Sequence, residues 1–216
     1  MKNKTKFVLR FFKLMFGLFL FALGVIECIN ANIGYAPWDV FHVGLSQTTG
    51  LSLGVVSIVT GLFIIVLVVF LKEILGIGTI LNMIFIGVFI DIINYLNFIP
   101  VMSNFWYGFI LMQIGLLTLS IASYFYISAG FGAGPRDSLM VALARRTPLP
   151  IGICRSIVEA TAVISGFFLG GYVRIGTVVY VLLIGVYVQL VFMILRFNPG
   201  YIKHESIRQT FSSFKK

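Results

Sequence analysis

Six apolar runs dominate the chain, and each of them predicts one membrane-spanning helix. The runs cover residues 15–30, 53–71, 78–96, 105–129, 151–170 and 176–195. About 20 apolar residues in a helix are enough to cross the hydrocarbon core of a bilayer. Hydrophobic residues make up 59% of the chain and charged residues only 11%, which excludes an ordinary soluble fold. The sequence therefore predicts an all-α protein with a single membrane domain over residues 1–216, in contact with the lipid bilayer.

The basic residues predict the orientation of these spans. Lys and Arg number 16 against 7 Asp and Glu, an excess that would suggest a nucleic-acid partner in a soluble protein but reports topology in a membrane protein. With the N-terminus inside, the cytoplasmic side receives the N-terminal cluster and a basic tail over 196–216, and Arg174 alone falls outside. The other cytoplasmic basic residues are Lys72, Arg136, Arg145, Arg146, Arg155 and Arg196. We therefore expect both termini in the cytoplasm and no nucleic-acid partner.

The two polar stretches between spans are copies of each other. Residues 32–39 end in Pro-Trp-Asp and residues 130–137 end in Pro-Arg-Asp, and the offset between them is 98 residues. The same offset relates further matches along three spans without a gap, such as the Ile-Gly-Thr sequences at 77–79 and 175–177. Such a match predicts an internal duplication. Repeat one covers about 14–96 and repeat two about 105–195.

The number of spans in each repeat determines how the repeats are related. Three is odd, so the second repeat enters the membrane from the opposite side to the first. We therefore predict a 3+3 inverted-topology repeat, with a pseudo-two-fold axis in the membrane plane. Each repeat has a short re-entrant or interfacial helix after its first span, over 40–49 and 138–147.

Two Pro-x-Asp turns begin these short helices and are the strongest candidates for a site. Pro37 and Pro135 suit the first position of a helix, and Asp39 and Asp137 suit its first turn, where the helix dipole favours a carboxylate. A plain helix start therefore explains all four residues. The alternative is a substrate site, because a carboxylate that dips into the membrane needs a partner or a cation.

The neighbours of the two turns belong to the same candidate site. Gly132 and Gly134 allow the backbone to bend and to approach a ligand closely. Arg136 is the nearest partner for the second carboxylate, and Trp38 occupies the corresponding position in the first repeat. Helix starts of this kind line the substrate sites of transporters built from inverted repeats.

Charged residues inside the spans also need an explanation, because a charge in hydrocarbon costs at least ~2.5 kcal/mol. Arg155 and Glu159 are four residues apart on one helical face, so we expect an ion pair that faces protein and lies near the candidate site. Glu27 and Asp91 lie near the outer ends of spans, where they can reach the interface. Gly166 and Gly170 form a small-xxx-small pair typical of a helix-packing face.

Several segments resemble the YczE/YyaS/YitT group of bacterial membrane proteins, and the YczE branch most closely. The segments are 34–39 (GYAPWD), 49–52 (TGLS), 130–140 (GFGAGPRDSLM) and 176–177 (GT). The resemblance covers nearly the whole chain, and its most distinctive part is Gly-x-Gly-Pro-Arg-Asp. It implies a multi-pass protein of the bacterial cytoplasmic membrane and no agreed biochemical activity.

The function that the repeats favour is a small secondary transporter or permease. Its two halves would rock around a site between the Pro-x-Asp turns and move a small polar or cationic solute. The alternative is an accessory or regulatory protein that acts on a membrane-protein partner, and a homo-oligomer is also open. An enzyme is not expected: His42 and His204 are the only histidines, and the sequence has no Walker or dinucleotide motif, so no catalytic residue, metal or cofactor is predicted.

Overall fold

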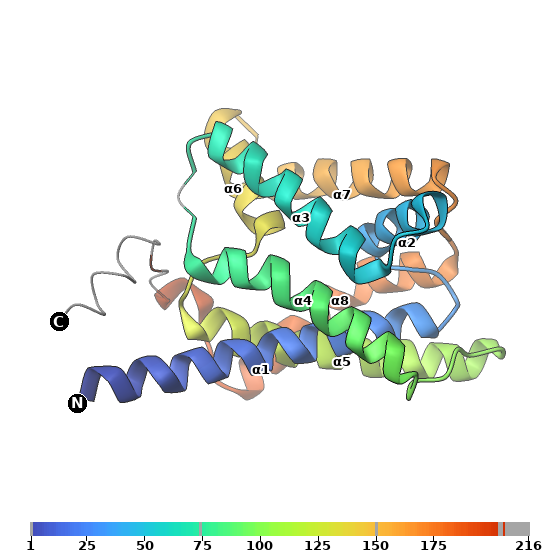
Figure 1. Ribbon diagram of the computed structural model, residues 1–216, viewed down its shortest axis with the longest axis horizontal. Helices are drawn as coiled ribbons and strands as arrows, with labels where there is room; N and C mark the ends of the chain where they lie inside the picture. The colour runs from blue at the N-terminus through green and yellow to red at the C-terminus, as the bar shows by residue number, and fades with distance from the viewer. Residues whose placement is uncertain (1, 74, 150, 203–204, 206–216) are drawn as a thin grey trace.

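The computed structural model describes residues 2–73, 75–149, 151–202 and 205, and these residues form α-helices and one 3-10 turn (Figure 1). The long helices are α1 (Lys2–Asn30), α3 (Leu53–Phe70), α4 (Ile77–Leu96), α5 (Phe105–Ala129), α7 (Ile151–Phe168) and α8 (Ile175–Ile194). The short helices are α2 (Pro37–Thr49) and α6 (Pro135–Arg146), and the 3-10 turn is Pro199–Tyr201. The predicted all-α class is confirmed for this part of the chain, whereas most of the expected basic tail lies outside it.

Five helices in the described part are long and apolar enough to cross a membrane. They are Thr5–Asn30, Leu53–Phe70, Ile77–Leu96, Phe105–Ala129 and Ile175–Ile194. The fifth of the six predicted spans, 151–170, corresponds to α7, which is not among them. Arg155 and Glu159 lie within α7 and lower its hydropathy. The described part of the chain is therefore helical and contains five candidate spans by length and composition.

Local sequence sets the helix boundaries as expected. Pro37 and Pro135 are the first residues of α2 and α6, where the missing N–H of proline has no helical partner to lose. The Ser52 hydroxyl accepts a hydrogen bond from the Val55 N–H at the start of α3. Gly130 ends α5 with φ of 73°, a left-handed conformation that glycine adopts without strain.

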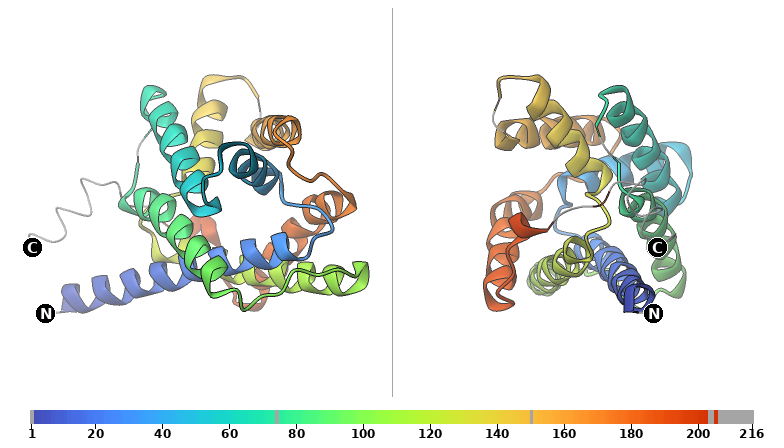
Figure 2. Two further views of the ribbon diagram at one scale, coloured as in Figure 1. Left: turned by 45° about the vertical axis from the view of Figure 1, so that its right-hand side comes forward. Right: turned by 90° about the vertical axis from the view of Figure 1, so that its left-hand side faces the viewer.

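The centre of the fold is the packed pair α1 and α5. Helix α4 lies against α1 and α8 against α5, while α3, α7 and the short helices lie on one side of the central pair (Figure 2). Glycine brings the central backbones together: a Cβ on Gly17 would lie 2.7 Å from the Tyr126 nitrogen, and one on Gly24 would lie 3.0 Å from the Leu119 nitrogen. Close backbone approach of this kind stabilises helix pairs in membranes through van der Waals contact.

The short helices cross between the two halves of the chain. Helix α2 packs on α7, and α6 packs on α3. Two hydrogen bonds show the same exchange: the Gly78 N–H donates to the Phe131 carbonyl, and the Gly176 N–H donates to the Ile33 carbonyl, each at 2.8 Å. Their donors are 98 residues apart and so are their acceptors. The two halves are therefore interlocked through equivalent positions.

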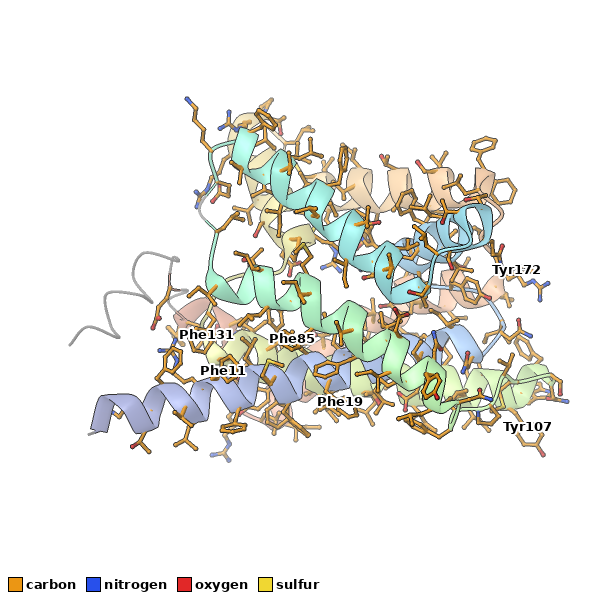
Figure 3. The ribbon with its side chains drawn as sticks, in the orientation of Figure 1. Phe11, Phe19, Phe85, Tyr107, Phe131 and Tyr172 are labelled. Carbon is orange, nitrogen blue, oxygen red and sulfur yellow. The ribbon has the colours of Figure 1, made fainter. Side chains whose placement is uncertain are left out.

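The two ends of the helix bundle differ in how they are closed. One end, which we call the basic end, holds the start of α1, the turn from α3 to α4 and the end of α6 (Figure 1). There Arg145 forms an ion pair with Glu73 at 2.8 Å, and Arg146 donates to the Leu71 carbonyl. Phe131 lies toward this end, whereas Tyr107 and Tyr172 lie at the opposite end (Figure 3). Arginine side chains of α6 thus join the basic end to the turn that follows α3.

The opposite end is closed by backbone contact between α2 and α7. A Cβ on Gly44 would lie 2.7 Å from the Gly166 carbonyl oxygen, and one on Gly171 would lie 2.1 Å from the Val40 carbonyl oxygen. Only glycine fits such distances. Gly166 therefore lies in a packing face, as the small-xxx-small pattern predicted, while Gly170 lies beyond the end of α7 with φ of 91°.

Candidate functional site

A cavity of about 450 Å³ lies between the two halves of the chain and is bordered by both Pro-x-Asp turns. Its volume is within the usual range of sites for small molecules. Nine of the residues predicted for a site line it: Pro37, Trp38, Asp39, Gly134, Pro135, Arg136, Asp137, Arg155 and Glu159. The structure thus brings together side chains from α2, α6 and α7 that are up to 122 positions apart in sequence.

The lining is drawn from equivalent positions in the two halves. Many lining residues have a partner 98 positions away that also lines the cavity. Such pairs include Trp38 and Arg136, Asp39 and Asp137, His42 and Met140, Ser57 and Arg155, Gly61 and Glu159, and Asn82 and Tyr180. The cavity therefore lies where the two halves face each other.

Arg136 and Trp38, one such pair, contact each other directly. The guanidinium carbon of Arg136 lies 4.7 Å from the centroid of the Trp38 ring, a cation–π contact between α6 and α2. Its Nη2 lies 3.5 Å from His42 Nε2. Within the described residues, Arg136 forms no ion pair with a carboxylate. The Trp38 ring is thus the main contact of the Arg136 guanidinium within the described residues.

Asp137 is the carboxylate that is open to the cavity. Its side chain is exposed although it lies well inside the protein, because it borders the cavity. The Tyr126 hydroxyl donates to Asp137 Oδ2 at 3.3 Å and accepts a hydrogen bond from the Gly134 N–H. Tyr126 therefore ties the start of α6 to α5.

Asp39 has a different environment, since it is only 4% exposed. Its Oδ1 lies 4.0 Å from His42 Nδ1. Both residues are on α2, outside the candidate spans. Burial raises the pKa of Asp39 to about 6, against the opposing effect of Arg136. Burial, assisted by Arg136, holds the pKa of His42 well below its usual value, so His42 is neutral at pH 7.

Arg155 and Glu159 form the ion pair that their spacing predicted. Arg155 Nε lies 2.9 Å from Glu159 Oε1, and both side chains line the cavity. The Arg155 side chain is 57% exposed and that of Glu159 is 27% exposed. With all groups ionised, the cavity holds two arginines and three carboxylates, so it has one negative charge in excess.

Gly132 does not line the cavity, unlike the other predicted site residues. It has φ of 121°, and a Cβ at this position would lie 2.7 Å from the Gly76 Cα. Gly132 thus allows the segment before α6 to approach the start of α4.

Two charged residues expected at the membrane interface have other roles. Asp91 accepts hydrogen bonds from the Ser52 hydroxyl at 2.5 Å and the Gly54 N–H at 2.8 Å, so it joins α4 to the start of α3. Glu27 is buried against α5, where a Cβ on Gly115 would lie 3.2 Å from the Glu27 Cβ. Both residues are therefore held by neighbouring helices, which agrees with the expectation that charged residues inside spans face protein.

Several lining residues were missed by the sequence argument. Tyr126, Tyr180 and Thr60 border the cavity, and the Thr60 hydroxyl is buried without a partner in the described structure. Tyr180 could have been found, since it is 98 positions from Asn82 in a repeat with few polar positions. Tyr126 carried no such signal, because its equivalent is Cys28.

The chain has relatives of the kind that the sequence resemblance indicated. It is 35% identical over 197 residues to the uncharacterized membrane protein YczE of Bacillus subtilis, which covers 90% of this chain and 87% of the relative. It is 33% identical over 176 residues to an uncharacterized protein of Haemophilus influenzae, and this match covers 82% of this chain and 80% of the relative. It is 25% identical over 172 residues to the uncharacterized protein YyaS of Bacillus subtilis, and this match covers 78% of this chain and 85% of the relative. No solved structure matches the chain.

These similarities confirm the resemblance to YczE and YyaS and agree with the apolar helices in placing the protein in a membrane. The chain also matches a family description over residues 8–193, from the first span to the end of α8. The protein is therefore an integral membrane protein that belongs to the Family of unknown function (DUF6198).

Proposed function

We propose that the protein is a small secondary transporter of the bacterial cytoplasmic membrane and that the cavity between the Pro-x-Asp turns is its substrate site. The observation that carries the proposal is the lining of one cavity by equivalent residues of both halves. In transporters with inverted repeats, the substrate site lies at the interface of the repeats, often at the starts of short or broken helices. Helices α2 and α6 supply such starts here.

The proposal includes a 3+3 inverted repeat in which α7 also spans the membrane, so that the spans number six. The exchanged hydrogen bonds of Gly78 and Gly176 support it, because a two-fold relation makes each contact occur twice with its partners exchanged. The Arg155–Glu159 ion pair supports α7 as a span, since paired charges beside a cavity are far less costly than lone charges in lipid. Three spans in each half then require opposite orientations.

The difference between the two ends supports alternating access. At one end, glycines bring the backbones of α2 and α7 into contact, while at the other end arginine side chains of α6 bridge to the turn that follows α3. The positions equivalent to Gly44, Gly166 and Gly171 are Ala142, Val68 and Glu73, so bulkier side chains separate α6 from α3. A rocking motion would bring α6 closer to α3 at the basic end and separate α2 from α7 at the opposite end. The positive-inside rule places the basic end in the cytoplasm.

The test is solute uptake by purified protein in proteoliposomes. Thermal shifts across a panel of metabolites and cations first identify a ligand, and its uptake is then measured with a proton or sodium gradient. We expect Asp39→Asn and Asp137→Asn to abolish uptake while they preserve folding. Asp91→Asn is the matched control, because Asp91 is bound by Ser52 and Gly54 away from the cavity.

Two results would contradict the proposal. Uptake at the original rate by both Asn variants would leave the carboxylates as helix-start residues only. A ligand that binds in the cavity without ever crossing the bilayer would favour the alternative of an accessory or regulatory protein.

A further inference from the structure

The charges of the cavity are unbalanced. Arg155 and Glu159 neutralise each other at 2.9 Å. Asp39, Asp137 and Arg136 remain, so two carboxylates share one guanidinium. Unbalanced charge in surroundings of low dielectric constant is unfavourable, and an occupant of the opposite sign relieves it. The cavity is therefore suited to an occupant with one positive charge.

The two carboxylates are not equally available to such an occupant. Asp39 is buried beside His42, with only 4% of its surface exposed. Asp137 is exposed to the cavity, and the Tyr126 hydroxyl is its one hydrogen-bond donor within the described structure. Arg136 lies on the face of Trp38 rather than in an ion pair with Asp137. Asp137 is thus the carboxylate that a cation can reach.

The rest of the lining favours an organic cation over a hydrated metal ion. Aromatic side chains of four helices border the cavity, among them Trp38, Tyr126 and Tyr180. Aromatic rings attract ammonium groups, and the Arg136–Trp38 contact shows that this cavity already accommodates a cation on a ring. Met83 and Met140 add flexible apolar surface that adapts to an apolar group.

We infer that the cavity binds one small amphipathic organic cation, whose ammonium group pairs with Asp137 and whose apolar part packs against Met83 and Met140. This inference rests on the proposed function only in taking the cavity as the substrate site. The volume of about 450 Å³ admits a molecule with one ring and a short side chain.

Three compounds with a common benzyl group test the sign of the charge. Benzyltrimethylammonium carries one positive charge, benzyl alcohol none and phenylacetate one negative charge. The whole chain in detergent carries Trp106→Phe, which leaves Trp38 as the only tryptophan, and Trp106 is exposed at the start of α5. We expect a saturable change in Trp38 fluorescence with the cation alone.

Variants then test the position of the charge. Asp137→Asn should weaken binding of benzyltrimethylammonium at least ~10-fold, which corresponds to ~1.4 kcal/mol. Glu73→Gln should bind it as tightly as the parent protein, because Glu73 lies outside the cavity. Thermal unfolding of each variant shows that the comparison is made between folded proteins.

The outcomes separate this inference from the proposed function. Equal binding of the three compounds, preference for phenylacetate, or no binding at all would overturn the cation inference, even if Asp137→Asn failed to fold. Unchanged affinity in a folded Asp137→Asn variant would do the same. Selective binding of the cation without its uptake into proteoliposomes would leave the binding site in place and contradict transport.

Discussion

Asp39 and Asp137 occupy equivalent positions but have different surroundings. One is buried beside a neutral histidine and the other is open to the cavity and bound by Tyr126. The sequence predicted both residues as a pair, because the 98-residue offset relates them. It could not predict the difference, since burial depends on how α2 and α6 pack on the opposite halves. The same holds for the contact of Arg136 with Trp38, which joins residues that only the fold brings together.

The buried position of Asp39 predicts a pH dependence of stability. Its pKa is about 6 in the folded protein against an ordinary value of 3.8. Because the pKa is raised, protonated Asp39 favours the folded state below pH ~4. This contribution to the free energy of unfolding is up to ~3 kcal/mol and is lost as pH rises through 6. We therefore expect the stability of the parent protein, relative to Asp39→Asn, to fall between pH 4.5 and 7.5 in thermal unfolding experiments in detergent.

The difference between the two proteins is the quantity to measure. His42 has a lowered pKa and acts in the opposite direction, but it is present in both proteins, as is the nearby Arg136. Parallel pH profiles for the parent and the variant would show that Asp39 does not titrate in this range.

The Arg155–Glu159 pair predicts non-additive substitutions. Arg155→Ala leaves Glu159 without its partner at 2.9 Å, and Glu159→Ala leaves Arg155 unpaired, whereas the double variant removes both charges. We expect each single variant to give a lower yield of folded, membrane-inserted protein than the double variant. Losses that simply add would argue against a coupled pair.

Helix boundaries were predictable from local sequence, whereas helix partners were not. Proline starts α2 and α6, as expected, because its effect is confined to one turn. The packing of α2 on α7 and of α6 on α3 depends on contacts between distant segments. Gly166 carried a packing signal, but nothing in the sequence identified Val40 and Phe41 as the backbone it contacts.

The contact between α2 and α7 predicts a strong effect of one methyl group. In Gly166→Ala, the new Cβ would lie 2.4 Å from the Phe41 nitrogen, so α2 would have to move. Overpacking of this kind costs about 1–3 kcal/mol, and we expect a clear fall in the thermal unfolding temperature. Gly185→Ala on α8 is the matched control, because its Cβ would meet no atom within 4 Å and alanine favours a helix. Equal unfolding temperatures for the two variants would contradict this packing.

At the scale of the molecule, the proposed inverted repeat predicts on which side of the membrane each short helix ends. Thr49 and Thr147 are 98 positions apart, at the end of α2 and just after α6. Single cysteines at these positions, with Cys28 and Cys154 replaced by alanine, should react with a membrane-impermeant reagent from opposite sides in inside-out and right-side-out vesicles. Labelling of both from the same side would rule out the inverted arrangement.

The exchanged hydrogen bonds of Gly78 and Gly176 bear on how the chain matures after synthesis. Each half presents a donor whose acceptor belongs to the other half, so the Gly78 N–H in the first turn of α4 gains its partner only after the segment around Phe131 has emerged from the ribosome. We therefore expect the first half of the chain to remain an unfinished assembly until the second half is made, exposed to quality-control proteases. A gene divided at the loop between α4 and α5 should accordingly give two fragments that are each degraded alone and persist when they are produced together.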